Sequence, residues 1–173
     1  KLSIFIAITA IPLGWRAERR YRQMPRLRVE NDRCVNSDLV PGQQVIKATL
    51  PPISIIVPAR NEEKNLHSLL PSLCDLNYPG GVEVIVVDDN SADGTAEIAH
   101  GYGVRVISVD DLPDGWLGKP NACHQGATAA AGDWLLFTDA DTKHTPGGLA
   151  DVVKYALDNQ LDGLTCFLPH NTF

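Results

Sequence analysis

The chain has 173 residues, enough for one full domain or for a small domain with an appendage. Apolar residues make up 44% and charged residues 21%, which is typical of a globular protein and excludes a disordered chain. The formal net charge of -6 is unevenly distributed: residues 1–52 carry nine Lys and Arg against four Asp and Glu, whereas residues 53–173 carry six against seventeen. This asymmetry predicts two regions with different partners.

Residues 1–16 hold an uncharged run from Leu2 to Trp15, and a cluster of arginines follows it. As a helix this run would reach about 21 Å, which is short of a bilayer core of roughly 30 Å. We interpret it as an apolar membrane-proximal helix, the cytoplasmic end of a truncated transmembrane helix. The alternatives are an interfacial helix, a segment packed on the domain, or a signal sequence, although a signal peptide places its positive charges before the apolar run. Arginines after the run favour membrane association with the globular domain on the cytoplasmic face.

Residues 17–52 are basic and then polar, with prolines and no sustained periodicity, as is typical of a linker. We place the domain boundary after Pro51 and Pro52, so that residues 53–173 form the main domain. The four cysteines are widely scattered and lack the spacing of a zinc site. They predict free, buried thiols in a reducing compartment.

From residue 53 onward, segments with the pattern of strands alternate with segments of helical periodicity. Asn61 is the predicted N-cap of the first helix. Continuous apolar strands that alternate with helices predict a three-layer α/β/α domain with a mostly parallel sheet. The predicted strands are 53–58, 82–89, 104–109, 133–141 and 162–169, and the predicted helices lie within 61–76, 90–103, 119–132 and 146–157.

Polar side chains gather in the loops that follow four of these strands, at residues 59–62, 88–91, 110–119 and 139–142. An open parallel sheet binds ligands beyond the carboxyl ends of its strands, so these loops predict one site on one rim.

Asp139 and Asp141 end a buried strand with a single alanine between them. Both carboxylates can turn the same way, and a hard cation such as Mg2+ or Mn2+ would neutralise them. A solvated turn is the alternative. Asp88 and Asp89 similarly fit two alternatives: they accept hydrogen bonds from ribose hydroxyls, or they form an Asx turn. Lys119 either contacts a phosphate or extends into solvent.

Several classes of enzyme are disfavoured. No G-x-G-x-x-G follows the first strand, no G-x-x-x-x-G-K-[ST] occurs, and no G-x-S-x-G elbow is present. A dehydrogenase, a P-loop ATPase and a serine hydrolase are therefore disfavoured. The loop "ARNEE" is also too acidic to grip the triphosphate of a nucleotidyltransferase substrate.

The segments "ISIIVPARNEEKNL", "VEVIVVDDNSADGTAEIA" and "GWLGKPNACHQGATAAAGDWLLFTDADT" together resemble the family 2 glycosyltransferases of the GT-A fold. The resemblance covers about residues 53–173. The "GWLGKP" and "FTDAD" pieces look most like membrane-associated members that act on lipid-like acceptors. The resemblance implies an inverting, metal-dependent hexosyltransferase that uses a nucleotide-diphosphate sugar, with UDP-sugar favoured, and a lipid-like or polysaccharide acceptor. Nucleic acid is not an expected partner.

The resemblance also implies roles for individual residues. Asp139 and Asp141 match the D-x-D motif that holds Mn2+ or Mg2+ against the donor phosphates. The residues expected at the nucleotide sugar are Pro58, Ala59, Arg60, Asn61, Glu62, Asp88, Asp89, Lys119, Asn121 and Asp139. Three further residues are weaker candidates: His144 as a third metal contact, and His124 and Trp116 in the sugar pocket. For each of them, the favoured alternative is an ordinary loop residue without a role in the site.

No catalytic base can be assigned, because the family's base lies well downstream of the D-x-D and is expected beyond Phe173. The domain is therefore expected to be incomplete at its C-terminus and to turn over little or nothing by itself. The alternative hypothesis is a non-catalytic or truncated module that binds nucleotide sugars.

Overall fold

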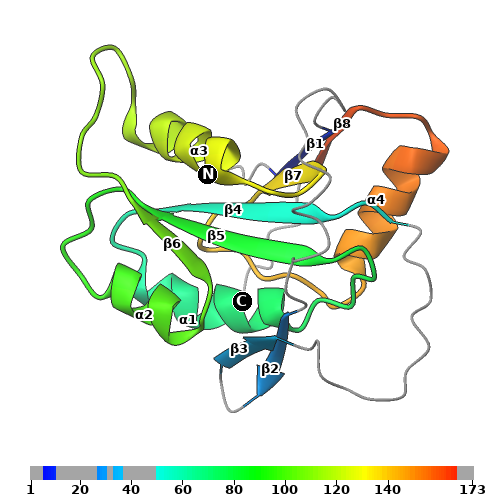
Figure 1. The fold of residues 1–173 in the computed structure, drawn as a ribbon, viewed down its shortest axis with the longest axis horizontal. Coiled ribbons are helices and arrows are strands. Elements are labelled where there is room, and N and C mark those ends of the chain that lie inside the picture. The colour runs from blue at the N-terminus through cyan, green and yellow to red at the C-terminus, as the bar shows by residue number, and fades with distance from the viewer. Residues whose placement is uncertain (1–5, 11–26, 31–32, 37–49, 167–173) are drawn as a thin grey trace, which may run out of the picture.

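A computed structural model describes residues 6–10, 27–30, 33–36 and 50–166. It contains a six-stranded sheet in the order β6-β5-β4-β7-β1-β8 and a separate two-stranded hairpin (Figure 1). The strands are β1 (Ile6–Ala10), β2 (Leu27–Glu30), β3 (Arg33–Asn36), β4 (Ile53–Ala59), β5 (Val82–Asp88), β6 (Arg105–Ser108), β7 (Trp134–Phe137) and β8 (Gly163–Cys166). The helices are α1 (Glu63–Cys74), α2 (Thr95–Gly101), α3 (Gly118–Ala129) and α4 (Gly148–Asp158).

The sheet is mostly parallel, as the sequence predicted. β4 lies parallel to both β5 and β7, and β5 lies parallel to β6. β1 runs antiparallel to both of its neighbours, β7 and β8. The carboxyl ends of β4, β5 and β7 therefore meet at one rim of the sheet.

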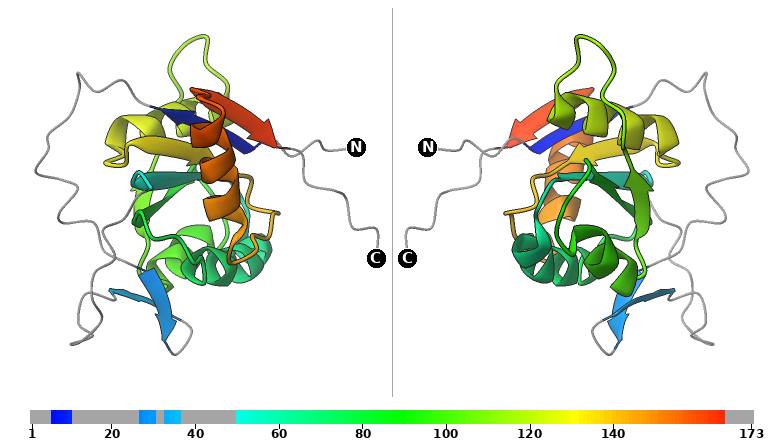
Figure 2. Two further views of the ribbon diagram at one scale, coloured as in Figure 1. Left: turned by 90° about the vertical axis from the view of Figure 1, so that its right-hand side faces the viewer. Right: turned by 90° about the vertical axis from the view of Figure 1, so that its left-hand side faces the viewer.

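Helices cover both faces of the sheet and make three layers (Figure 2). Because side chains alternate along a strand, Ile55 and Val57 of β4 face the layer of α1, α2 and α4, whereas Ile56 faces α3. Gly126 lets α3 approach closely, since a Cβ there would lie 2.5 Å from Cγ2 of Ile56. The predicted α/β/α architecture is confirmed.

Residues 6–10 correct one prediction. The sequence predicted a helix over residues 1–16, but Ile6–Ala10 form β1, paired along its length with β7 and β8. The physical reason is that a neighbouring strand satisfies backbone groups that β7 would otherwise leave unpaired at its edge. The remainder of the predicted helix and most of the linker 17–52 lie outside the described residues. Among the helices that the structure describes, none combines the length and hydropathy needed to cross a membrane.

The hairpin of β2 and β3 lies beside α1 within what was predicted to be a linker.

Two cysteines test the prediction of free thiols. Cys123 is a free, partly buried thiol, as predicted. Cys74 is buried but disulfide-bonded, so the prediction is wrong for this residue.

Candidate nucleotide-sugar and metal site

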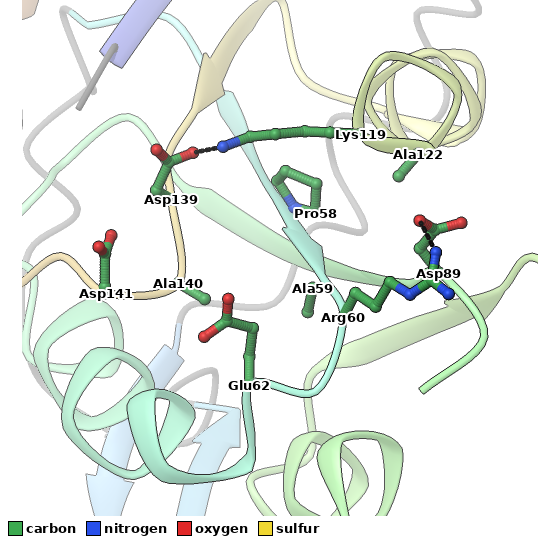
Figure 3. A pocket seen from close by; sticks show the side chains of 10 residues that line it. All are labelled: Pro58, Ala59, Arg60, Glu62, Asp89, Lys119, Ala122, Asp139, Ala140 and Asp141. Atoms are coloured by element: carbon green, nitrogen blue, oxygen red, sulfur yellow. Dashed lines mark ion pairs between the residues drawn. The ribbon is translucent and has the colours of Figure 1, made fainter. Parts of the chain in front are cut away.

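A pocket opens at the rim where β4, β5 and β7 end, and the first turn of α3 forms one of its walls (Figure 3). The pocket encloses about 140 Å³ and is open to solvent. Loops after β4, β5 and β7 meet here as predicted, whereas the loop after β6 contributes only at its end, where α3 begins. The lining residues are Pro58, Ala59, Arg60, Glu62, Asp89, Lys119, Ala122, Asp139, Ala140 and Asp141.

The turn between β4 and α1 is fixed by contacts with the loop after β5. The backbone N–H of Asn61 donates to Oγ of Ser91 at 2.9 Å, and its side-chain Oδ1 accepts from the N–H of Ala92 at 2.8 Å. The N–H of Glu62 donates to Oγ1 of Thr95 at 2.9 Å. These bonds hold Glu62 at the pocket wall.

Asn61 differs from its predicted role. It has a left-handed φ of 56°, and the N-cap of α1 is Glu62, without a capping hydrogen bond from a side chain. Asparagine tolerates this backbone conformation better than most residues. Asn61 therefore shapes the turn and does not line the pocket.

The two acids after β5 divide into a pocket residue and a turn residue. Asp89 lines the pocket, and its Oδ2 lies 3.8 Å from Nη1 of Arg60. Asp88 is buried, and its Oδ1 accepts from the N–H of Ser91 at 3.2 Å, which is the Asx-type turn considered from the sequence. Asp88 thus supports the loop that presents Asp89.

The first turn of α3 carries the third group of predicted residues. Nζ of Lys119 lies 2.6 Å from Oδ1 of Asp139, across the pocket (Figure 3). Asn121 is 1% exposed, and its Nδ2 has no hydrogen-bond partner in the described part of the chain. Nearby, burial raises the pKa of the Cys123 thiol, an effect that Lys119 opposes and Asp139 reinforces.

The turn that carries Asp139 and Asp141 is held by hydroxyl groups. Oγ1 of Thr142 donates to the carbonyl oxygen of Asp139 at 2.7 Å and lies 2.9 Å from Oγ1 of Thr138. Nε2 of His144 lies 3.0 Å from Oγ1 of Thr138. Since each hydroxyl has one hydrogen, Thr138 donates to Thr142 and the Nε2–H of His144 donates to Thr138.

This network gives His144 a structural role. Its Nε2 carries the proton, its own N–H donates to Oγ of Ser72 at 3.1 Å, and burial lowers the pKa of its imidazole. The weaker candidate role as a metal contact is not supported, because His144 does not line the pocket and no group of three or more metal-ligating side chains occurs among the described residues. His124 and Trp116 also fall outside the lining, and their rings lie 5.1 Å apart at an interplanar angle of 38°.

The charge of the pocket suits a divalent cation. Four carboxylates and two cationic side chains line it, leaving a net charge of two negative, which would repel a diphosphate. In the part of the chain that the structure describes, no group of three or more His, Cys, Asp or Glu could hold a metal. Asp139 and Asp141 therefore fit an ion that takes two protein carboxylates and completes its shell with phosphate and water, as Mg2+ does.

Two lining residues were missed by the sequence prediction. Ala122 and Ala140 present small apolar surfaces between charged neighbours. Alanine carries no chemical signal for a site, so only the spacing of its charged neighbours could have suggested it.

The mostly parallel, three-layer domain belongs to the open α/β class, whose members bind ligands at the carboxyl rim of the sheet, where the acidic pair lies. The family model described as Glycosyl transferase family 2 matches residues 54–172. The chain belongs to glycosyl transferase family 2.

Relatives and solved structures agree with this assignment. The chain is 48% identical over 90 residues to 4,4'-diaponeurosporenoate glycosyltransferase of Staphylococcus aureus, a match that covers 51% of this chain and 24% of that protein. S. aureus TarS 1-349 in complex with UDP-GlcNAc has a TM-score of 0.54 and 32% identity, covering 63% of this chain and 32% of that one.

Glucosyl-3-phosphoglycerate synthase from Mycobacterium tuberculosis, solved with Mn2+, UDP and glucosyl-3-phosphoglycerate, has a TM-score of 0.53 and 30% identity. This match covers 69% of the present chain and 45% of that chain. The chain spans about a quarter of the length of the curated relatives it matches.

Proposed function

We propose that this chain forms the donor-binding part of a metal-dependent, inverting glycosyltransferase that uses a nucleotide-diphosphate sugar. The observation that carries the proposal is the pocket at the ends of parallel strands, where Asp139 pairs with Lys119 and Asp141 lines the same space. UDP-sugar is the favoured donor, because solved neighbours of this fold bind UDP and UDP-GlcNAc. The presence of Mn2+ in one of them supports a divalent cation.

Different pocket residues would contact different parts of the donor. Asp89, held beside Arg60, would accept hydrogen bonds from the nucleoside, and the turn at Glu62 would close that end of the pocket. Lys119 would contact the diphosphate as a point charge. The unpaired, buried amide of Asn121 is a hydrogen-bond donor that a phosphate oxygen or an ordered water would satisfy.

Asp139 and Asp141 would hold Mn2+ or Mg2+ against the phosphates. A bound divalent cation supplies Lewis-acid neutralisation of the charge that develops on the departing diphosphate. The network of Thr138, Thr142 and His144 holds the backbone of the turn from which the Asp139 side chain projects. In an inverting transfer, the acceptor oxygen would bond to the anomeric carbon from the face opposite the diphosphate as the bond to the diphosphate breaks. An acceptor hydroxyl would give its proton to a base, for which no residue is assigned, whereas a carboxylate would attack without one.

The experiment that tests the donor proposal is calorimetric titration of UDP-glucose, GDP-mannose and UMP into the full chain, with Mn2+ and with EDTA. We expect UDP-glucose to bind in Mn2+, to lose affinity in EDTA, and to bind more tightly than UMP, which lacks the second phosphate. Equal binding of UDP-glucose and UMP would contradict a diphosphate site.

We also propose a lipid-like acceptor, which the name of the relative 4,4'-diaponeurosporenoate glycosyltransferase supports. The test measures binding to the full chain, in the presence of UDP and Mn2+, of an apolar carboxylic acid in detergent micelles and, in parallel, of a soluble polysaccharide. Tighter binding of the apolar acid is expected, and tighter binding of the polysaccharide would contradict it.

Association with a membrane surface is a further part of this proposal, supported by the arginines that follow Trp15 in the sequence. Sedimentation of the full chain with anionic vesicles should exceed sedimentation with neutral vesicles. Replacing Arg16, Arg19, Arg20 and Arg22 by Glu should abolish the difference. Unchanged sedimentation of this variant would contradict the proposed surface.

A further inference from the structure

The strongest unassigned feature of the pocket is the ion pair between Lys119 and Asp139. Nζ of Lys119 lies 2.6 Å from Oδ1 of Asp139, and the two side chains are 60% and 16% exposed. Lys119 comes from the first turn of α3, whereas Asp139 follows β7, so the pair bridges two walls of the pocket (Figure 3). The ammonium therefore sits on an oxygen that a metal would need.

This ion pair disfavours binding of a metal ion in the absence of nucleotide. An ammonium beside Oδ1 of Asp139 repels a divalent cation that approaches the same oxygen. Asp141 is exposed and has no ion-pair partner among the described residues, so it offers one unopposed carboxylate. One exposed carboxylate is a weak site for a strongly hydrated cation.

Lys119 can leave Asp139 without movement of the backbone. Its side chain is mostly exposed, and lysine has a flexible four-carbon stem. The helix that carries it packs closely on the sheet at Gly126, where a Cβ would lie 2.5 Å from Cγ2 of Ile56. A rotation of the Lys119 side chain is therefore enough to exchange one anionic partner for another.

A diphosphate in this pocket would supply that second partner. Its oxygens carry more negative charge than one carboxylate, and they would also attract the divalent cation. Once Lys119 turns to the phosphates, Oδ1 of Asp139 becomes available, and the cation gains ligands from Asp139, Asp141 and the diphosphate together. Each ligand then favours binding of the other.

We propose that Lys119 is a positioning residue that exchanges Asp139 for the donor diphosphate, so that the divalent cation binds tightly only together with the nucleotide. This inference rests on the proposed function, because it needs a diphosphate in the pocket. It goes beyond that function by assigning the coupling between cation and nucleotide to one side chain.

The test measures free Mn2+ by electron paramagnetic resonance during titration of the full chain, once without nucleotide and once with UDP. The variants are Lys119→Met, which removes the charge, and Lys119→Arg, which keeps it. Lys143→Met is the matched control, because Lys143 is an exposed lysine next to the same turn but does not line the pocket.

Without nucleotide, Lys119→Met should bind Mn2+ about fivefold more tightly than the parent chain, a modest gain because the ion pair is partly exposed. With UDP, the same variant should bind Mn2+ more weakly than the parent chain, since the diphosphate has lost its cationic partner. Lys119→Arg and Lys143→Met should follow the parent chain in both titrations.

Two results would overturn the exchange. One is an unchanged nucleotide-free affinity in Lys119→Met, and the other is an equal gain in Lys143→Met, which would reduce the effect to general electrostatics. The proposed function fails separately if UDP leaves the Mn2+ affinity of the parent chain unchanged while Lys119→Met still gains affinity without nucleotide. In that case Lys119 opposes the metal, but no diphosphate replaces Asp139.

Discussion

The hydroxyl of Thr142 donates to the carbonyl oxygen of Asp139 at 2.7 Å, and this bond ends a chain of donors that begins at His144. These hydrogen bonds support the backbone of Asp139 and do not contact its carboxylate. Thr138 and Thr142 are both buried, which shields these bonds from water. The D-x-D turn is thus a supported structure and not a free loop.

Thr142→Val should disturb both stability and the site. Valine matches the shape of threonine but removes the hydroxyl, leaving buried partners unsatisfied at a cost of about 1–3 kcal/mol in the free energy of unfolding. Affinity for UDP with Mn2+ should also fall, because Asp139 loses its orientation. Denaturant unfolding and calorimetry measure the two effects. Thr128→Val is the matched control: Thr128 is exposed on α3 and should change neither quantity appreciably.

The stability of the fold should decrease in acid through His144. Burial lowers the pKa of this histidine below the ordinary value of 6.5, so the folded chain favours the neutral ring. Below that ordinary pKa the unfolded state takes up the proton first, and the contribution of His144 is lost as the pH falls through its folded pKa.

His144→Gln tests this contribution, because glutamine keeps a donor but does not titrate. Its unfolding free energy should vary less between pH 7 and pH 5 than that of the parent chain. His67→Gln, at an exposed position on α1, serves as the control. Identical pH profiles for the parent chain and His144→Gln would show that this network does not sense pH.

Gly118→Ala should affect binding more than folding. A Cβ at position 118 would collide with Oδ2 of Asp89, the end of a side chain that can rotate away. The free energy of unfolding should therefore change by no more than about 1 kcal/mol. Rotation would separate Asp89 from Arg60, so affinity for UDP should fall.

Gly101→Ala provides the comparison for this substitution. Gly101 ends α2, and no atom lies within 4 Å of a Cβ built there. Alanine should leave binding unchanged and preserve or slightly raise stability. If Gly118→Ala binds UDP as well as Gly101→Ala does, the position of Asp89 is not important for the nucleotide.

The rim of the sheet could be predicted from the sequence because its signals are local. Each strand is a short apolar run, and the acids at 89, 139 and 141 follow such runs directly. Parallel pairing of β4 with β5 and β7 then brings the three loops together.

Other features depend on contacts distant in the sequence. The run around Ile6–Ala10 is apolar whether it forms a helix or a strand, and only its pairing with β7 and β8 decides. The pair of Lys119 and Asp139 likewise depends on how α3 lies over the sheet. The prediction of Asn61 as an N-cap was wrong because asparagine favours left-handed turn positions as well as helix caps, and Asn61 occupies a left-handed position.

The most direct test of the central claim is calorimetric titration of UDP with Mn2+ into the full chain and into the double variant Asp139→Asn/Asp141→Asn, with Asp158→Asn as an exposed control on α4. Asparagine keeps the shape of the turn but removes both charges. The account predicts that the parent chain and Asp158→Asn bind UDP with equal affinity in Mn2+, and that the double variant loses at least about tenfold in affinity, down to the value measured in EDTA. Equal Mn2+-dependent affinity in the parent chain and the double variant would contradict it.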